Sequence, residues 1–201
     1  MRQWTSPLAV ARFSGWIYIL SPQIAGIARF EYTRDGARSS GLCAASLKKV
    51  KILAQNIRIA AFQPDIAPNL GTMIRLSACF DAPISVIEPC GFPFSAKALR
   101  RSAMDYADNA TILHHASWEA FYASLTGRLI LMSTKAATPL WDFEFQKGDT
   151  IMMGRESAGV PADVAAACDA RLLIPMPGGG RSLNVAVSAG IALGEAMRQL
   201  R

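Results

Sequence analysis

From about residue 57 onward, short apolar runs alternate along the chain with segments whose apolar residues recur at helical spacing. The runs lie at residues 57–62, 84–87, 129–132, 150–153 and 171–174, and a shorter one lies near residues 110–113. Proline, glycine or polar residues bound them, as is typical of strands. Strands that alternate with helices favour a mostly parallel sheet flanked by helices, so the pattern predicts an α/β domain.

Helices are predicted where apolar residues recur three and four positions apart. One starts near Asn69, which can cap it, and places Leu70, Met73 and Ile74 on one side. Further helices are expected over residues 117–125 and 183–200. The last one carries many Ala, Ser and Gly residues, which permit the close approach of another helix.

Residues 1–56 differ from the rest of the chain, because their apolar bursts are short and are interrupted by proline and glycine. They hold eight Lys or Arg and two acidic residues, whereas residues 57–201 hold thirteen of each sign. The net charge of +6 therefore belongs to the first quarter of the chain and does not indicate what the remainder binds. We expect a poorly ordered basic extension at residues 1–56, with a short RNA-binding arm as the alternative, followed by one domain at residues 57–201.

Cysteine and histidine spacing gives no support for a metal site. The four cysteines lie far apart without a C-x-x-C pair, and the only two histidines are adjacent. We therefore expect no metal, and we expect the cysteines to be buried, reduced thiols of a cytoplasmic protein. The apolar bursts near the start are too short to span a membrane, so no membrane association is predicted.

Two glycine-bearing loops follow predicted strands late in the chain. One is residues 154–161 (GRESAGVP), and the other is residues 175–182, which contain two prolines and three consecutive glycines. Glycine lets another group approach the backbone closely, which suits a ligand-binding loop, although a flexible surface connection would explain the glycines equally well. Two such loops at strand ends favour a ligand crevice. Neither loop has the G-x-G-x-x-G dinucleotide fingerprint or the Walker sequence.

Three ordered segments carry a resemblance to a known family. Residues 69–75 (NLGTMIR), residues 154–159 (GRESAG) and residues 174–184 (IPMPGGGRSLN) resemble, in this order, the signature motifs of the SpoU branch of the SPOUT RNA methyltransferases. The resemblance covers roughly residues 57–199. It implies S-adenosylmethionine as the cofactor, an RNA substrate, a homodimer and a C-terminal part threaded into a deep trefoil knot. Such knots are rare exceptions to ordinary topology, so periodicity alone does not predict one.

The resemblance also implies a cofactor site. Main-chain groups near Met132, Gly154 and Ile174, together with Ser182, would hold S-adenosylmethionine. Of these four, Gly154 is also favoured by the loop pattern itself.

The resemblance assigns removal of the ribose 2′-hydroxyl proton to Arg75, helped by Glu156, Ser182 and Asn184. Arginine is a poor base, because its pKa exceeds about 12 and the charged group has no acceptor. We expect Arg75 instead to bind the phosphate beside the target ribose and to stabilise developing oxyanion charge. Asn69 would orient Arg75 or cap its helix, and Glu156 would act in catalysis or fix a loop.

A basic helix is expected after residue 93. Lys97, Arg100 and Arg101 lie three and four positions apart on one face, which fits either a phosphate backbone or a solvated surface. Arg155 is a further candidate RNA contact.

Residues 87–106 resemble one subgroup of the family, the bacterial enzymes that 2′-O-methylate cytidine or uridine at position 34, the wobble nucleotide, of certain leucine tRNAs. The sequence therefore predicts a tRNA 2′-O-methyltransferase. Two alternatives stay open: another tRNA or rRNA target, and a catalytically silent RNA-binding protein on the same scaffold.

Overall fold

The computed structural model describes residues 9–13, 16–20, 57–93 and 110–201. The chain divides into two compact units, Met1–Ala44 and Ala45–Arg201. In the first unit, β1 (Ala9–Phe13) pairs antiparallel with β2 (Trp16–Leu20), where the sequence predicted no element. The predicted basic helix with Lys97, Arg100 and Arg101 lies outside the described residues.

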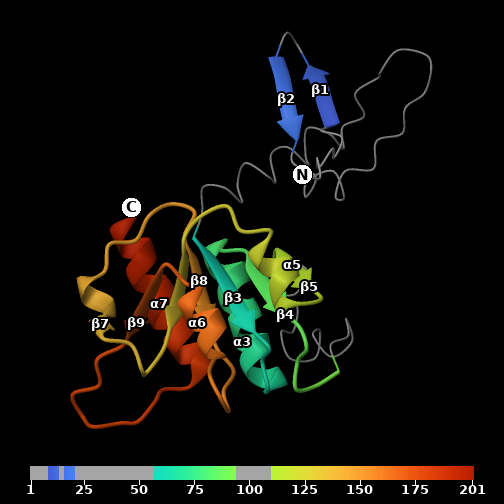
Figure 1. The fold of residues 1–201 in the computed structure, drawn as a ribbon. Coiled ribbons are helices and arrows are strands. Elements are labelled where there is room, and N and C mark those ends of the chain that lie inside the picture. The colour runs from blue at the N-terminus through green and yellow to red at the C-terminus, as the bar shows by residue number, and fades with distance from the viewer. Residues whose placement is uncertain (1–8, 14–15, 21–56, 94–109) are drawn as a thin grey trace, which may run out of the picture. The chain divides into compact units, whose positions relative to one another are not determined.

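The second unit is built on a parallel sheet of seven strands, which lies between helices on its two faces (Figure 1). The strands run in the spatial order β5-β4-β3-β8-β6-β9-β7, and every described pairing among them is parallel. The predicted α/β architecture is confirmed. The strands are β3 (Arg58–Phe62), β4 (Ile84–Ile87), β5 (Ile112–His115), β6 (Leu129–Met132), β7 (Thr138–Pro139), β8 (Thr150–Met153) and β9 (Ala170–Leu173).

In the part of the chain that the structure describes, two long helices and three short ones flank this sheet. The long ones are α3 (Ala67–Phe80) and α7 (Val185–Gln199), which pack against each other. The short ones are α5 (Trp118–Tyr122), α6 (Ala162–Ala166) and the 3-10 turn η2 (Leu140–Asp142). The predicted final helix is confirmed to within two residues at its start.

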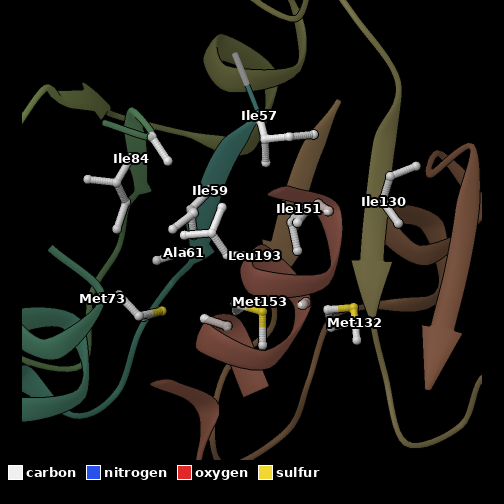
Figure 2. Close-up of a cluster of buried hydrophobic side chains, with 14 of the residues drawn as sticks. Ile57, Ile59, Ala61, Met73, Ile84, Ile130, Met132, Ile151, Met153 and Leu193 are labelled. Carbon is white, nitrogen blue, oxygen red and sulfur yellow. The ribbon is translucent and has the colours of Figure 1, made fainter. Parts of the chain in front are cut away.

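Apolar side chains cover both faces of the sheet, because successive residues of a strand point to opposite sides. In β3, Ile59 and Ala61 belong to the core beneath α3 and α7, whereas Ala60 and Phe62 belong to the core beneath α5 and α6. Figure 2 shows the first core, where Leu193 of α7 lies among side chains of β3, β6 and β8. A strand that is buried on both faces has no polar face, which is why these strands read as continuous apolar runs.

The start of α3 differs from the prediction. The helix begins at Ala67 with Ile66 as its N-cap, and a proline occupies its first turn, so Asn69 is not the cap. Proline is favoured there because its missing N–H is one of the donors that a helix N-terminus leaves unsatisfied. The Asn69 side chain therefore forms its hydrogen bonds outside the helix.

The prediction of buried cysteines is wrong for Cys79, which is exposed on α3, and correct only in part for Cys90 and Cys168, which are half-buried free thiols. Burial raises the pKa of both half-buried thiols to about 11, so they are protonated at neutral pH. Cys43 lies outside the described residues.

The stability of the second unit depends on α7 being packed over the sheet. Leu193 is fully buried there, so Leu193→Ala is expected to lower the free energy of unfolding by about 3 kcal/mol. Arg198→Ala on the same helix is the control, because its ion pair with Glu195 is exposed on the arginine side and an exposed ion pair contributes little to stability. Urea denaturation of the three proteins measures both values; equal midpoints for all three would contradict this packing.

Candidate active site

A cleft of about 980 Å³ opens at the edge of the sheet where β6, β8 and β9 end. Parallel strands bring all their carboxyl ends to one edge, so the loops that follow them become neighbours. Residues 132–136, 153–160 and 181–185 line the cleft, together with Ile174 and Met176. Both predicted glycine loops thus contribute to one cleft.

The loop after β8 is closed on itself by its own backbone. The N–H groups of Arg155 and Gly159 each donate to the carbonyl of the other at 2.9 Å. Gly159 has a φ of 72°, which favours glycine. A Cβ on Gly154 would come within 2.9 Å of the Gly159 carbonyl carbon, so position 154 has no room for a side chain. These two glycines are required by the loop's shape.

Three polar side chains from three distant segments form one hydrogen-bonded chain at the cleft. Asn184 donates from Nδ2 to Asn69 Oδ1 at 3.0 Å, and Asn69 donates from Nδ2 to Glu156 Oε1 at 3.0 Å. Asn184 also caps α7, because its Oδ1 accepts from the N–H groups of Ala186 and Val187. The second oxygen of Glu156 accepts from the Asp65 backbone N–H at 2.8 Å. The structure therefore brings together three of the residues predicted for catalysis.

Arg155 is engaged within the protein. Its guanidinium donates to Asp65 Oδ1 at 2.7 Å from Nη2 and at 3.2 Å from Nε. The Arg155 and Ser157 side chains, both bonded to the carboxylate, lower the pKa of Asp65 to about 2, and the same ion pair raises the pKa of Arg155. If Arg155 contacts RNA as predicted, it does so while paired with Asp65 or after this ion pair is broken.

All four residues predicted to hold the cofactor line the cleft: Met132, Gly154, Ile174 and Ser182. Arg75 does not belong to its lining. It is exposed on α3 six residues beyond Asn69, a separation of about 9 Å along a helix axis. Arg75 therefore lies outside the lining of the cleft in its own chain.

Sequence reasoning missed Asp65, Arg171 and Arg181. Asp65 lies in the loop after β3, and Arg171 and Arg181 line the cleft together with Lys135, which follows the strand end where the cofactor site was predicted to begin. Among the described residues, no carboxylate forms an ion pair with any of these three basic side chains. Arg181 directly precedes Ser182, so its place beside a predicted site residue was the one available signal.

Neither a metal site nor a membrane helix is found in the described part of the chain. No three His, Cys, Asp or Glu side chains there gather as metal ligands. The described helices are too short or too polar to cross a bilayer. His114 lies 3.2 Å from Glu88, whereas His115 lies 3.2 Å from Ser85, so the two adjacent histidines have different partners.

A parallel sheet with a glycine-lined cleft at its carboxyl edge is the architecture of α/β proteins that bind a small-molecule ligand or cofactor. The family model described as the SpoU rRNA Methylase family matches residues 56–194. The chain belongs to this family.

Relatives of known name cover the same region. A tRNA (cytidine(34)-2′-O)-methyltransferase of Beijerinckia indica is 52% identical over 145 residues, which are 71% of this chain and 91% of that protein. The protein of the same name from Escherichia coli K12 is 35% identical over 72% of this chain and 94% of its own length.

Solved structures agree with this assignment. A structure solved for the 2-OH methylation of C/U34 on tRNA is 36% identical, has a TM-score of 0.69, and matches over 73% of this chain and 97% of its own. An rRNA methyltransferase from Sinorhizobium meliloti bound to AdoMet is 26% identical with a TM-score of 0.65, over 73% of this chain and 57% of its own.

The Asp65 carboxylate gives a testable pH dependence. Its pKa falls from 3.8 to about 2 on folding, so its ion pair stabilises the native state fully above pH 4, and this contribution is lost as the pH falls toward 2. Urea midpoints of the wild type and Asp65→Asn are therefore expected to differ at pH 6 and to converge between pH 4 and pH 2. A difference that persists unchanged to pH 2 would contradict this assignment.

Proposed function

We propose that this protein transfers a methyl group from S-adenosylmethionine to the ribose 2′-hydroxyl of nucleotide 34, a cytidine or modified uridine, of tRNA, with leucine isoacceptors as its substrates. The observation that carries the proposal is the hydrogen-bonded chain Asn184–Asn69–Glu156. It joins all three family motifs at one cleft, in a chain that is 52% identical to a tRNA (cytidine(34)-2′-O)-methyltransferase.

The cleft fits S-adenosylmethionine in size and lining. Its volume of about 980 Å³ lies at the upper end of the usual range for small-molecule sites. Met132, Met153 and Ile174 supply apolar walls, and the loop from Gly154 supplies main-chain donors and acceptors. When bound, this cofactor supplies an electrophilic methyl group on a sulfonium, which the ribose 2′-oxygen attacks as the carbon–sulfur bond breaks.

The protein's own residues then have distinct tasks. Both Glu156 oxygens accept hydrogen bonds, so we assign Glu156 to fixing the loop rather than to removing the proton. Arg75 binds the phosphate beside the target ribose and stabilises the charge that develops on the 2′-oxygen, while the phosphate takes the proton. Ser182, exposed at the cleft, hydrogen-bonds the cofactor.

We further propose a homodimer, built on the exposed side of α3 and α7. Val187 in the first turn of α7 and Leu183, two residues before that helix, expose 51% and 40% of their surface, and Phe80 of α3 exposes 41%. Exposed apolar side chains of this kind favour a protein interface. Because Arg75 does not line the cleft of its own chain, the dimer would bring the partner's Arg75 to the ribose.

The proposed topology is a trefoil knot. After β9 the chain passes back beyond β6 to pack α7 against α3 and β8. This return runs beside the loops that follow β6 and β8, which line the same cleft as residues 181–185. We propose that the chain threads through one of these loops.

We further propose that the chain consists of a basic extension at residues 1–56 and a catalytic domain at residues 57–201, and that the protein acts in the cytoplasm.

Basic side chains at the cleft would hold the tRNA backbone. Lys135, Arg171 and Arg181 line the cleft on three different loop or strand segments. Phosphate contacts of this kind position a nucleic acid without reading its sequence. Lys97, Arg100 and Arg101, which lie outside the described residues, stay predicted RNA contacts.

The proposed reaction is tested by incubating the purified protein with labelled S-adenosylmethionine and bulk tRNA from a strain that lacks the gene. Nucleoside analysis is expected to find the label in a 2′-O-methylated nucleotide at position 34. Label at another nucleotide would show that the enzyme has a different target nucleotide, and cofactor binding without any transfer would favour a silent RNA-binding protein.

The same assay tests the role of Arg75. Arg75→Ala is expected to lower kcat roughly 100-fold or more, with Arg75→Lys retaining more activity.

The tRNA surface is tested with Arg181→Gln. Losing one phosphate contact is expected to weaken tRNA binding and to lower the slope of log affinity against log salt by about 1. The control is Arg198→Gln, because Arg198 is exposed near the far end of α7. Affinities and salt slopes from a filter-binding titration compare the variants; identical slopes for Arg181→Gln and the wild type would remove Arg181 from the RNA surface.

A further inference from the structure

The loops after β3 and β8 leave the sheet side by side. The two strands are neighbours, and Ala61 of β3 pairs with Met153 of β8. Both segments then continue past the edge of the sheet, so Asp65 lies opposite the first residues of the loop that contains Gly154. The parallel register therefore brings Asp65 into contact with Arg155, which lies 90 positions later in the sequence.

Asp65 bonds to three consecutive residues of that loop. Its carboxylate accepts from the Arg155 guanidinium at 2.7 Å, and from the Ser157 hydroxyl at 2.6 Å and the Ser157 N–H at 3.1 Å. Its backbone N–H donates to Glu156 at 2.8 Å. One residue therefore fixes the side chains of Arg155, Glu156 and Ser157 at once.

Asp65 is itself held in place from the other side. A Cβ on Gly91 would come within 2.9 Å of the Asp65 Cα, and the Gly91 N–H donates to the Pro64 carbonyl at 2.9 Å. The Asp65 side chain retains only 18% exposure. Because the loop after β4 packs this closely, Asp65 forms a rigid support rather than a mobile surface contact.

The support extends to the cleft through Glu156. With one oxygen bonded to the Asp65 N–H, the other oxygen of Glu156 is directed to Asn69, which in turn bonds Asn184. Asp65 does not line the cleft, whereas Glu156, Asn69 and Asn184 do. Any effect of Asp65 on a ligand must therefore pass through these residues and the loop.

We propose that Asp65 is a positioning residue of the active site, which holds the Gly154–Pro161 loop in its cofactor-binding shape and directs Glu156 toward Asn69. The proposal rests on the proposed function, because it takes S-adenosylmethionine as the ligand whose affinity depends on the shape of this loop. It assigns Asp65 no contact with the cofactor or the RNA.

The first test compares S-adenosylmethionine affinity in Asp65→Asn and in a matched control, Glu195→Gln. Glu195 also pairs with an arginine, Arg198, and its pKa is also lowered to about 2, but it lies on α7 away from the cleft. Asp65→Asn is expected to raise the Kd about tenfold, which corresponds to about 1.4 kcal/mol. Glu195→Gln is expected to leave the Kd unchanged. Calorimetric titration well below the unfolding temperature keeps a loss of stability from mimicking a loss of affinity.

The second test is a double-mutant cycle with Arg155→Met. If Asp65 acts through the loop, Asp65→Asn costs little further affinity once Arg155 is gone, so the two effects are not additive. Fully additive effects, or an unchanged Kd in Asp65→Asn, would overturn the proposal.

A third variant, Ser157→Ala, removes one hydrogen bond to Asp65 without changing the charge. It is expected to give a smaller loss of affinity, and it replaces Asp65→Asn if that variant does not fold. A wild-type protein that fails to bind S-adenosylmethionine would overturn the proposed function together with this inference, whereas wild-type binding with an unaffected Asp65→Asn overturns this inference alone.

Discussion

The parallel pairing of β3, β8 and β6 is the constraint on which the site depends. Parallel register places the carboxyl ends of these strands at one edge, although they lie far apart in the sequence. Parallel strands need covered faces, and the two cores on either side supply that cover. The cleft is thus a consequence of the sheet: with the strands fixed, the loops that follow them have to meet.

The opposite edge of the sheet is fixed by charge. Asp149, which is 1% exposed, accepts a bidentate pair of hydrogen bonds from Arg128, at 2.9 Å from Nε to Oδ1 and at 2.7 Å from Nη2 to Oδ2. The Arg128 guanidinium also lies 5.0 Å from the centre of the Phe143 ring. The two edges therefore differ in kind. Apart from Asp65 and Arg155, the polar side chains of the Asn184–Asn69–Glu156 chain pair through amides and single hydrogen bonds, whereas the amino edge is closed by an ion pair whose carboxylate is buried.

Much of the fold follows from the sequence, because strands buried on both faces appear as uninterrupted apolar runs. The runs at 84–87, 129–132 and 150–153 coincide with β4, β6 and β8. The spatial order of the strands did not follow, since apolar runs carry no information on which neighbour each strand selects. The two glycine loops predicted the cleft by their pattern alone. Its polar side chains were predictable only where family motifs marked them, which is why Glu156 and Asn184 were named and Asp65 was not. Asn69 shows the limit of local reasoning: its type favours a helix cap, but a proline in the first turn moves the cap to Ile66 and leaves the amide to a tertiary contact.

The hydrogen-bonded chain at the cleft has a direction that its last member imposes. An ionised Glu156 only accepts, so Asn69 must turn its NH₂ toward Glu156 and its carbonyl toward Asn184, which then must donate. Asn184 has its own carbonyl committed to the first turn of α7. An aspartate at 184 would cap the helix but face another acceptor, and a serine is too short to do both. A substitution of Asn184 therefore requires a compensating substitution at position 69 or 156. These three positions are expected to evolve together although they belong to three separate motifs.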